Sequence, residues 1–286
     1  KAQGKRNEDL AEGSPLLNQA PHPNVVEVHW MGRVPPEREW YVIEMEYFPS
    51  VTLAQMLDQG EEGFVASYTC LLGVFAQVLD GCAHLHGVGM SHGDIKPQNI
   101  LVSAEQVKLT DFGSSVLPHE MYARTRENGG TILYSAPEVV GATLPARDSS
   151  ARYLTDVYSL GVLLYHLVTA RLPHDTLSQV ARHVPFPRAR ELNSSVSPAL
   201  DAFIDRALCQ EPADRWQSVE AMVEAFQAVR RAQLAFNPTR ALTAARASHE
   251  DWSSHAVRRL ESGQYRDAEL VARAEFESSR DAHAFL

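Results

Sequence analysis

Apolar and polar residues alternate along two short stretches in the first fifty residues. Residues 25–30 and residues 40–47 both follow the period of two that a half-buried strand requires. A turn is predicted between them at residues 32–38, which contain Pro35 and Pro36. This pattern predicts an antiparallel hairpin of two strands.

From Leu53 onward, the spacing of the apolar residues becomes helical. The longest apolar segment, residues 67–85, ends before Gly87 and Gly89, which are typical helix stops. Further helices are predicted over residues 156–170, 199–208 and 219–230, and two short strands over residues 100–102 and 107–109. A small part rich in strands thus precedes a larger helical part, which indicates the α+β fold class.

The end of the chain has a pattern of its own. Residues 236–251 resemble a linker, and residues 255–285 are helical in their spacing. The run GQYRDA at residues 263–268 is similar to the segment between the two helices of a tetratricopeptide unit. A plain amphipathic extension is the other interpretation. If the repeat is present, we expect this C-terminal helical region to bind a protein partner.

The charge balance argues against one class of function. The 286 residues include 26 Lys and Arg against 36 Asp and Glu, which gives a formal net charge of −10 at pH 7. A chain this acidic is a poor nucleic-acid binder, so we expect no nucleic-acid partner. Lysine is scarce, so a reaction that needs a lysine must choose among Lys1, Lys5, Lys96 and Lys108.

Cysteines and apolar runs bear on the location of the protein. Cys70, Cys82 and Cys209 are widely spaced and form no CxxC pair, which argues against a zinc site or a disulfide framework. A reducing, cytoplasmic location is therefore expected. The longest uncharged apolar run, residues 64–79, is too short to span a bilayer and predicts a buried helix, so we expect no membrane segment in this chain.

The loop around Pro97 carries the most chemical information. Asp94, Lys96 and Asn99 fall within six residues of one another, and Asp111 follows Asn99 by twelve residues. Amide and carboxylate oxygens are ligands that Mg²⁺ prefers, while an ammonium group neutralises phosphate charge. The second carboxylate is then available to orient a hydroxyl nucleophile. This set of side chains predicts magnesium-dependent nucleotide chemistry.

The same residues belong to a series of sequence blocks that resembles the protein kinase family. In the order of that family, the chain contains HPNVV at 22–26, HGDIKPQN at 92–99, DFG at 111–113, GTILYSAPE at 130–138, DVYSLGV at 156–162 and EPADRW at 211–216. Lys96 followed by Pro97 is similar to the Ser/Thr branch, and residues 167–229 are most similar to bacterial members. The resemblance implies a two-lobed protein-kinase-like fold, ATP and Mg²⁺ as cofactors, and a protein Ser or Thr as substrate.

The resemblance also implies roles for residues of the catalytic loop (residues 92–99) and of the two blocks that follow it. Asp94 would orient the substrate hydroxyl and accept its proton, and Lys96 would contact the transferred γ-phosphate. Asn99 and Asp111 would be the Mg²⁺ ligands. Thr131 would hydrogen-bond near Asp94 and Lys96 and shape the substrate pocket.

Residues outside the catalytic loop receive structural roles from the same resemblance. Glu138 and Arg215 would form a buried ion pair that braces the larger lobe. Asp156 would fix the backbone of the catalytic loop from the central helix.

On the nucleotide side, the resemblance points to the end of the second predicted strand. Met45 would be the gatekeeper, and the backbones of Glu46 and Phe48 would meet the adenine. Leu101 would pack beneath the adenine ring.

The chain departs from the family at its start. No GxGxxG loop precedes the first predicted strand pair, and the lysine for the α- and β-phosphates would have to be Lys1 or Lys5. Glu12 is the best partner for Lys1, but only eleven residues separate them, which is cramped for a full helix. We therefore expect a truncated small lobe. The expected domains are a partial small lobe at 1–47, a helical lobe at 48–231, and a linker with a helical extension at 232–286.

A second departure is Gly93, which stands where the family usually has an Arg. That Arg normally meets a phosphate on the activation loop, so we expect activity that depends little on phosphorylation of Ser114, Ser115 or Thr125. HGD also occurs in small-molecule kinases of the aminoglycoside and choline type, although these usually lack the DFG and APE blocks.

The favoured prediction is a protein-serine/threonine kinase of bacterial type. One alternative is a pseudokinase that docks partners through its helical lobe and tail, which the missing phosphate loop favours. The other alternative is a small-molecule phosphotransferase.

Overall fold

The computed structural model describes residues 21–34, 40–58, 67–104, 106–111, 131–140 and 149–236. The chain divides into two units, Lys1–Phe236 and Asn237–Leu286, and every described residue lies in the first. The predicted linker, the helical tail and the tetratricopeptide-like run therefore lie outside the described residues, as do Lys1 and Glu12.

Strands β1 (Val28–Val34) and β2 (Trp40–Met45) pair antiparallel, which confirms the predicted hairpin. β1 begins three residues later than the alternation predicted, because the segment before it pairs elsewhere. Val26 is 2% exposed, and its N–H donates to the Leu109 carbonyl over 2.9 Å. The Leu109 N–H in turn donates to the Asn24 carbonyl over 2.9 Å. The hairpin is thus connected to the larger lobe through backbone hydrogen bonds.

The larger lobe contains a second small sheet, of order β3-β4-β5, in which all pairs are antiparallel. Its strands are β3 (Val51–Thr52), β4 (Ile100–Val102) and β5 (Val107–Leu109). The predicted strands at 100–102 and 107–109 are confirmed at the same residues. In this sheet Leu101 lies directly opposite Lys108.

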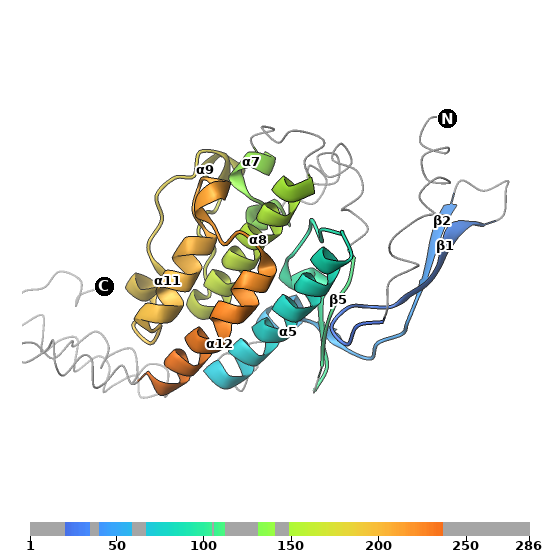
Figure 1. The fold of residues 1–286 in the computed structure, drawn as a ribbon, viewed down its shortest axis with the longest axis horizontal. Helices are drawn as coiled ribbons and strands as arrows, with labels where there is room; N and C mark the ends of the chain where they lie inside the picture. Colours follow the sequence, from blue (N-terminus) through green and yellow to red (C-terminus); the bar gives the residue numbers. More distant parts are fainter. Residues whose placement is uncertain are drawn as a thin grey trace, which may run out of the picture. The chain divides into compact units, whose positions relative to one another are not determined.

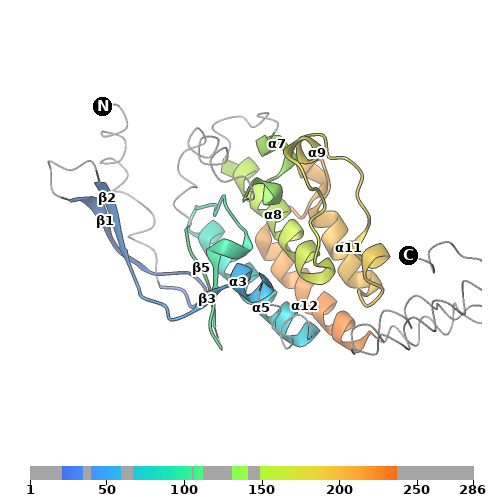
Figure 2. The same cartoon turned by 180° about the vertical axis from the view of Figure 1, so that it is seen from behind.

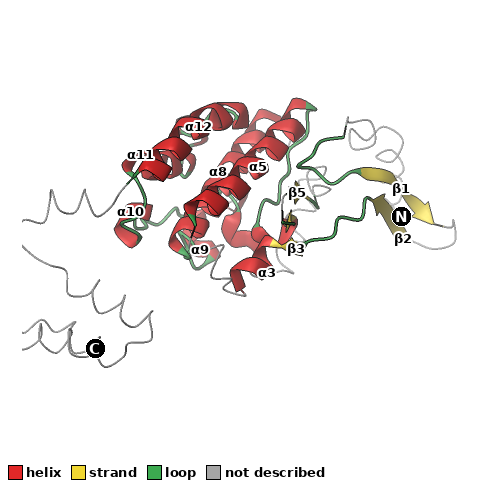
Figure 3. Cartoon of the chain, turned by 90° about the horizontal axis from the view of Figure 1, so that it is seen from below, coloured by secondary structure: helices red, strands yellow, loops and turns green. Residues whose placement is uncertain are grey.

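Packed helices form the core of the described unit (Figure 1). α5 (Tyr68–Gly87) packs against α12 (Val219–Ala235), and α8 (Ser149–Thr169) packs against α11 (Pro198–Ala207). Viewed from behind, α8 crosses the middle of the helical lobe (Figure 2). The short helix α3 (Leu53–Asp58) packs against β3 and β4. Figure 3 shows that helices make up most of this lobe and that its strands are short.

The sequence explains why α8 occupies the centre. From Val157 to Val168 nearly every residue is buried, and a helix that is apolar on all sides belongs in a core. Gly161 allows α8 to approach α11 closely, because a Cβ there would lie only 2.7 Å from the Ala207 Cβ. α8 begins at Ser149 rather than at Asp156, since its polar first turns lack the apolar period that predicted the helix.

Shorter elements connect these helices. They are α3 (Leu53–Asp58), α7 (Pro137–Val140), α9 (Leu177–Ala181), α10 (Ala189–Leu192) and the 3-10 turns Pro97–Asn99, Thr131–Tyr134 and Pro212–Asp214.

Among the described helices, α5 has the length and apolar composition that a membrane span would need. Half of its apolar window is buried inside the protein. Phe75 of α5 meets Phe226 of α12 edge-on, with ring centroids 5.1 Å apart. These contacts identify α5 as a core helix, as its sequence predicted.

Among the residues that the structure describes, Arg215 is the largest side chain that is fully buried. Its two terminal nitrogens donate to the two Glu138 carboxylate oxygens over 2.7 and 2.8 Å. The remaining N–H groups donate to the carbonyls of Leu154, Cys209 and Gln210. The predicted ion pair is therefore present, and it connects α7, α8 and the segment after α11.

We expect Arg215→Met to lower the free energy of unfolding by about 3–5 kcal/mol, because it leaves the Glu138 carboxylate and three carbonyls without their donor. Urea denaturation would measure this loss. Arg188→Met is the matched control: the Arg188 side chain is 47% exposed in its pair with Asp201, so its loss is expected to cost about 1 kcal/mol or less. Equal losses in the two variants would contradict the bracing role.

Candidate active site

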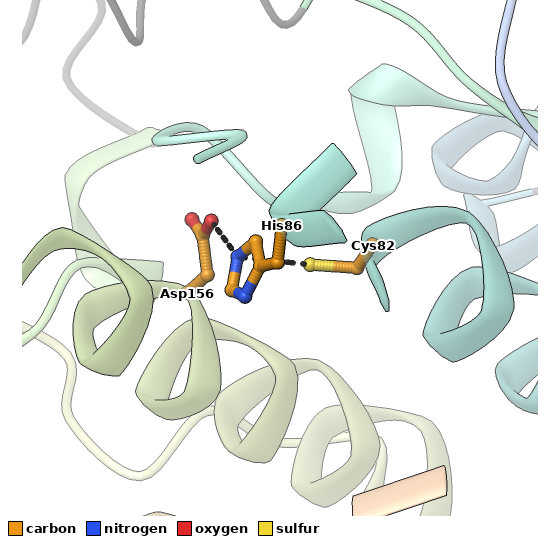
Figure 4. A group of neighbouring side chains, drawn as sticks. All are labelled: Cys82, His86 and Asp156. Atoms are coloured by element: carbon orange, nitrogen blue, oxygen red, sulfur yellow. Dashed lines mark hydrogen bonds and ion pairs between the residues drawn. The ribbon is translucent and has the colours of Figure 1, made fainter. Parts of the chain in front are cut away.

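The carboxylate of Asp156, on the central helix α8, holds the start of the catalytic loop (residues 92–99). One Asp156 oxygen accepts the His92 N–H over 2.7 Å, and the other accepts the Gly93 N–H over 2.8 Å. The His86 ring also donates to this carboxylate, with Nε2 2.9 Å from Oδ2 (Figure 4). Asp156 is 1% exposed, so a charge buried at this depth depends on these donors. The role implied by the resemblance, fixing the loop backbone, agrees with this geometry.

Gly93 has a conformational reason for being glycine. Its φ is +77°, in the left-handed region that residues with a Cβ rarely adopt. This turn of the backbone lets two successive N–H groups, those of His92 and Gly93, reach the same carboxylate.

Three of the predicted catalytic side chains, those of Asp94, Lys96 and Asn99, contact one another in this loop. Lys96 Nζ lies 2.7 Å from Asp94 Oδ2. The side-chain amide of Asn99 donates both to Asp94 Oδ2 and to the Asp94 carbonyl, each over 2.9 Å. Lys96 and Asn99 are buried, whereas the Asp94 side chain is 30% exposed. The carboxylate is thus oriented from the protein side and accessible from the solvent side.

Asp111 reaches the same loop from the end of β5. The N–H of Thr110, the residue before it, donates to the Asn99 carbonyl over 3.1 Å. The φ of Asp111 is +63°, an uncommon value for a residue with a side chain. Such strain persists where the surroundings determine the conformation, and it is concentrated at functional sites.

The buried His92 ring interacts with the carboxylates of Asp94, Asp111 and Asp156. Burial lowers the pKa of His92, while the carboxylates of Asp156, Asp94 and Asp111 and the Thr110 carbonyl act in the opposite direction. The imidazole is therefore neutral at pH 7, and its Nδ1 accepts the Asp94 N–H over 3.3 Å. This hydrogen bond helps to fix the backbone that carries the Asp94 carboxylate.

The side chains of Asn99 and Asp111 are of a type that can hold a magnesium ion. The side-chain nitrogen of Asn99 donates to Asp94. The amide oxygen of Asn99 is therefore the atom that would bind a metal ion. Together with the Asp111 carboxylate it offers hard oxygen ligands, which Mg²⁺ prefers.

A second cluster of ligand-type side chains is structural. Cys82, His86 and Asp156 are all buried, with ligand atoms within 4.8 Å of one another (Figure 4). Both Asp156 oxygens already accept backbone N–H groups, and burial raises the pKa of the Cys82 thiol well above its ordinary value. A neutral thiol beside an occupied carboxylate is a poor metal site, because metals bind the thiolate.

The residues predicted to surround the adenine lie at the end of β2, just after it, and on β4. Glu46 and Phe48 are partly exposed, Leu101 is half-buried in β4, and Met45 is 42% exposed. The structure brings Glu46 and Phe48 to one residue that the motif comparison missed, Lys108. The sequence offered one hint, because lysine is scarce in this chain and Lys108 is one of only four.

Three other predicted residues are assigned to the site on sequence grounds alone. Thr131 begins a 3-10 turn, but its side chain is outside the described part, as are Lys1 and Glu12. Their roles stay predictions.

A helical lobe that presents an aspartate, a lysine and an asparagine on one loop, beside an acidic residue that follows a strand, defines a phosphotransferase-type site. Residues 1–227 match the family model described as protein kinase domain. The chain therefore belongs to the protein kinase family.

Relatives are consistent with the predicted bacterial type. The chain is 31% identical over 208 residues to the serine/threonine-protein kinase PrkC of Bacillus subtilis, a match that covers 70% of this chain and 30% of PrkC. It is 34% identical over 228 residues to the serine/threonine-protein kinase pkn3 of Myxococcus xanthus, covering 73% of this chain and 39% of pkn3. The chain thus spans about a third of the length of these relatives.

A solved structure supports the fold. The kinase domain of Mycobacterium tuberculosis PknI, a C20A mutant, matches with a TM-score of 0.56 and 22% identity, covering 79% of this chain and 77% of that one. The predicted kinase-like fold is confirmed.

We expect Asp156→Asn to lower the free energy of unfolding by about 1–3 kcal/mol, because an amide cannot accept from all three donors. The shifted catalytic loop should also reduce kcat for phosphate transfer roughly 10- to 100-fold. The control is Asp201→Asn, which changes another buried carboxylate that accepts a backbone N–H and an Arg side chain. It should lose stability and keep its kcat. An unchanged kcat in Asp156→Asn would show that the anchor does not position the loop.

Proposed function

We propose that this protein transfers the γ-phosphate of ATP to Ser or Thr hydroxyls of proteins, with Mg²⁺ as the metal. The observation that carries the proposal is the position of Asp94, which Lys96 and Asn99 hold from the buried side while its carboxylate stays accessible. The Ser/Thr class is supported by the Lys96-Pro97 pair and by the names of the relatives.

The chemistry asks little covalent help of the protein. Phosphoryl transfer passes through a loose transition state, so most of the catalysis is positioning and charge stabilisation. Asp94 orients the incoming hydroxyl and accepts its proton as the new O–P bond forms and the bond from the γ-phosphorus to the leaving ADP breaks. Lys96, already beside Asp94, supplies positive charge where negative charge accumulates on the transferred group.

The metal would be held by Asn99 and Asp111. When bound, Mg²⁺ would neutralise negative charge on the phosphates of the nucleotide. The contribution of the chain is to hold the two ligands in register, through the hydrogen bond between the Thr110 N–H and the Asn99 carbonyl.

Several finer expectations belong to this proposal. Lys1 would bind the α- and β-phosphates with Glu12 as its partner, Thr131 would shape the substrate pocket, and the C-terminal helical region would bind a protein partner. A cytoplasmic location is proposed from the cysteine pattern.

We expect the full chain to incorporate radiolabel from [γ-³²P]ATP into a Ser/Thr-containing protein in the presence of Mg²⁺. Asp111→Ala should lower incorporation by about 100-fold or more, since it removes a metal ligand. Asp94→Asn should lower kcat by roughly 100- to 10,000-fold, because it removes the base. Equal incorporation by the wild-type protein and both variants would overturn the enzyme proposal, and absence of label with retained partner binding would favour a pseudokinase.

Activation-loop phosphorylation is expected to matter little, because Gly93 provides no guanidinium to receive a phosphate. The variant with Ser114, Ser115 and Thr125 all changed to Ala should retain kcat within about 2-fold. Phosphatase treatment of the wild-type protein before the assay is the companion measurement. A loss of 10-fold or more in either experiment would contradict this expectation.

A further inference from the structure

Lys108 is a buried cation to which none of the sequence motifs assigns a role. It lies in the middle of β5, 8% exposed, and its Nζ is 2.5 Å from Glu46 Oε1. The two residues are 62 positions apart in the sequence. An ammonium group this deeply buried requires a partner, and the Glu46 carboxylate is that partner.

Glu46 closes the base of the β1–β2 hairpin as well. Its N–H donates to the Glu27 carbonyl over 2.9 Å, and its Oε1 accepts the Glu27 N–H over 2.9 Å. Desolvation works to raise the pKa of Glu46, but the hydrogen bonds from Lys108 and Glu27 outweigh it, and the pKa lies below its ordinary value. The carboxylate is therefore ionised at neutral pH, and the ion pair is intact there.

The same ammonium group also contacts Phe48, a second residue of the segment expected to meet the adenine. Lys108 Nζ lies over the Phe48 ring, 5.5 Å from its centroid, which is within the range of a cation–π contact. Leu101 is the residue directly opposite Lys108 across the β4–β5 pair. Side chains at such paired positions share one face of a sheet. Lys108 thus contacts Glu46 and Phe48 and lies beside Leu101.

Lys108 is also close in sequence to the metal-ligand side of the site. β5 ends at Leu109, and Asp111 follows two residues later. The intervening Thr110 is fixed to Asn99 through its N–H. The strand that carries Lys108 is therefore the same strand that delivers Asp111 to the catalytic loop.

We propose that Lys108 is a positioning residue for the nucleotide, which holds the Glu46–Phe48 segment at a fixed distance from Asp111. Its contact with Glu46 sets where the adenine-facing backbone lies, and its strand sets where the Mg²⁺ ligand lies. The proposal rests on the proposed nucleotide-dependent function. It assigns Lys108 to nucleotide affinity and leaves phosphate transfer itself to Asp94, Lys96 and Asn99.

The choice of lysine agrees with this role. In a chain whose cations are mostly arginine, Lys108 contacts a single carboxylate oxygen and one aromatic face. A compact ammonium satisfies that geometry, whereas the planar guanidinium fork of arginine favours bidentate partners. Arg215, which meets both Glu138 oxygens, shows the other choice in the same molecule.

The test measures nucleotide affinity and turnover separately in the full chain. Lys108→Met keeps the length of the side chain and removes its charge, and Glu46→Gln keeps the shape of the carboxylate. Each variant should weaken equilibrium binding of a fluorescent ATP analogue with Mg²⁺ roughly 10-fold and raise KM for ATP by a similar factor. The kcat at saturating ATP should stay within about 2-fold of wild type.

The double variant separates a specific pair from general damage. If the two groups act as one unit, Lys108→Met combined with Glu46→Gln should bind no more weakly than the weaker single variant. Lys108→Arg should recover part of the affinity, because it restores the charge. Arg188→Met serves as a control, since it breaks an ion pair of the helical lobe at Asp201 and should leave nucleotide affinity unchanged.

The possible results distinguish this inference from the proposed function. Unchanged nucleotide affinity in folded Glu46→Gln and Lys108→Met would overturn the inference, as would a loss of kcat at unchanged KM. If Lys108→Met fails to fold, Glu46→Gln and Lys108→Arg decide the question. A wild-type chain that binds nucleotide but transfers no phosphate would refute the proposed function alone. A wild-type chain that binds no nucleotide would refute both.

Discussion

The arrangement of the catalytic loop depends on one buried carboxylate. Asp156 lies in the central helix α8, where water cannot solvate its charge, and the N–H groups of His92 and Gly93 and the His86 ring replace that solvation. A carboxylate in this position has few alternative partners, so the loop above it has few alternative conformations. The direction of Asp94 follows from this constraint, since its backbone continues from the two N–H groups that Asp156 holds.

Three of the buried charges each fix a different part of the described unit. Asp156 fixes the catalytic loop, Arg215 joins α7 to the core through Glu138, and Lys108 joins β5 to the hairpin through Glu46. A buried ion pair gains little net stability against apolar residues of the same volume, because both charges lose their hydration. Its advantage is geometric, since a buried charge is stable only when a complementary group lies at a defined position beside it. We infer that these pairs serve geometry more than stability.

The sequence predicted those parts of the fold and site that are local in the chain. The alternation at residues 40–47 located the hairpin strand β2, and the apolar run before Gly87 located α5. Asp94, Lys96 and Asn99 could be grouped because a short loop limits how far they can separate. Residues joined only by the tertiary fold left a weaker signal, and the Glu46–Lys108 pair spans 62 positions that periodicity cannot connect. The same limit applies to the start of α8, whose polar turns lack an apolar face.

Gly93 affects both the backbone conformation of the catalytic loop and the side chain available to bind a phosphate. From the motif alone, its meaning was the loss of an arginine that would receive an activation-loop phosphate. The structure adds a backbone reason, because the φ of +77° at this position is unfavourable for a residue with a Cβ but not for glycine. Glycine therefore relaxes the turn that presents two N–H groups to Asp156 and removes the phosphate receptor at the same position. We expect the Asp156 anchor to hold the catalytic loop without help from an activation-loop phosphate. For this reason, the conformational and regulatory consequences of Gly93 point in the same direction.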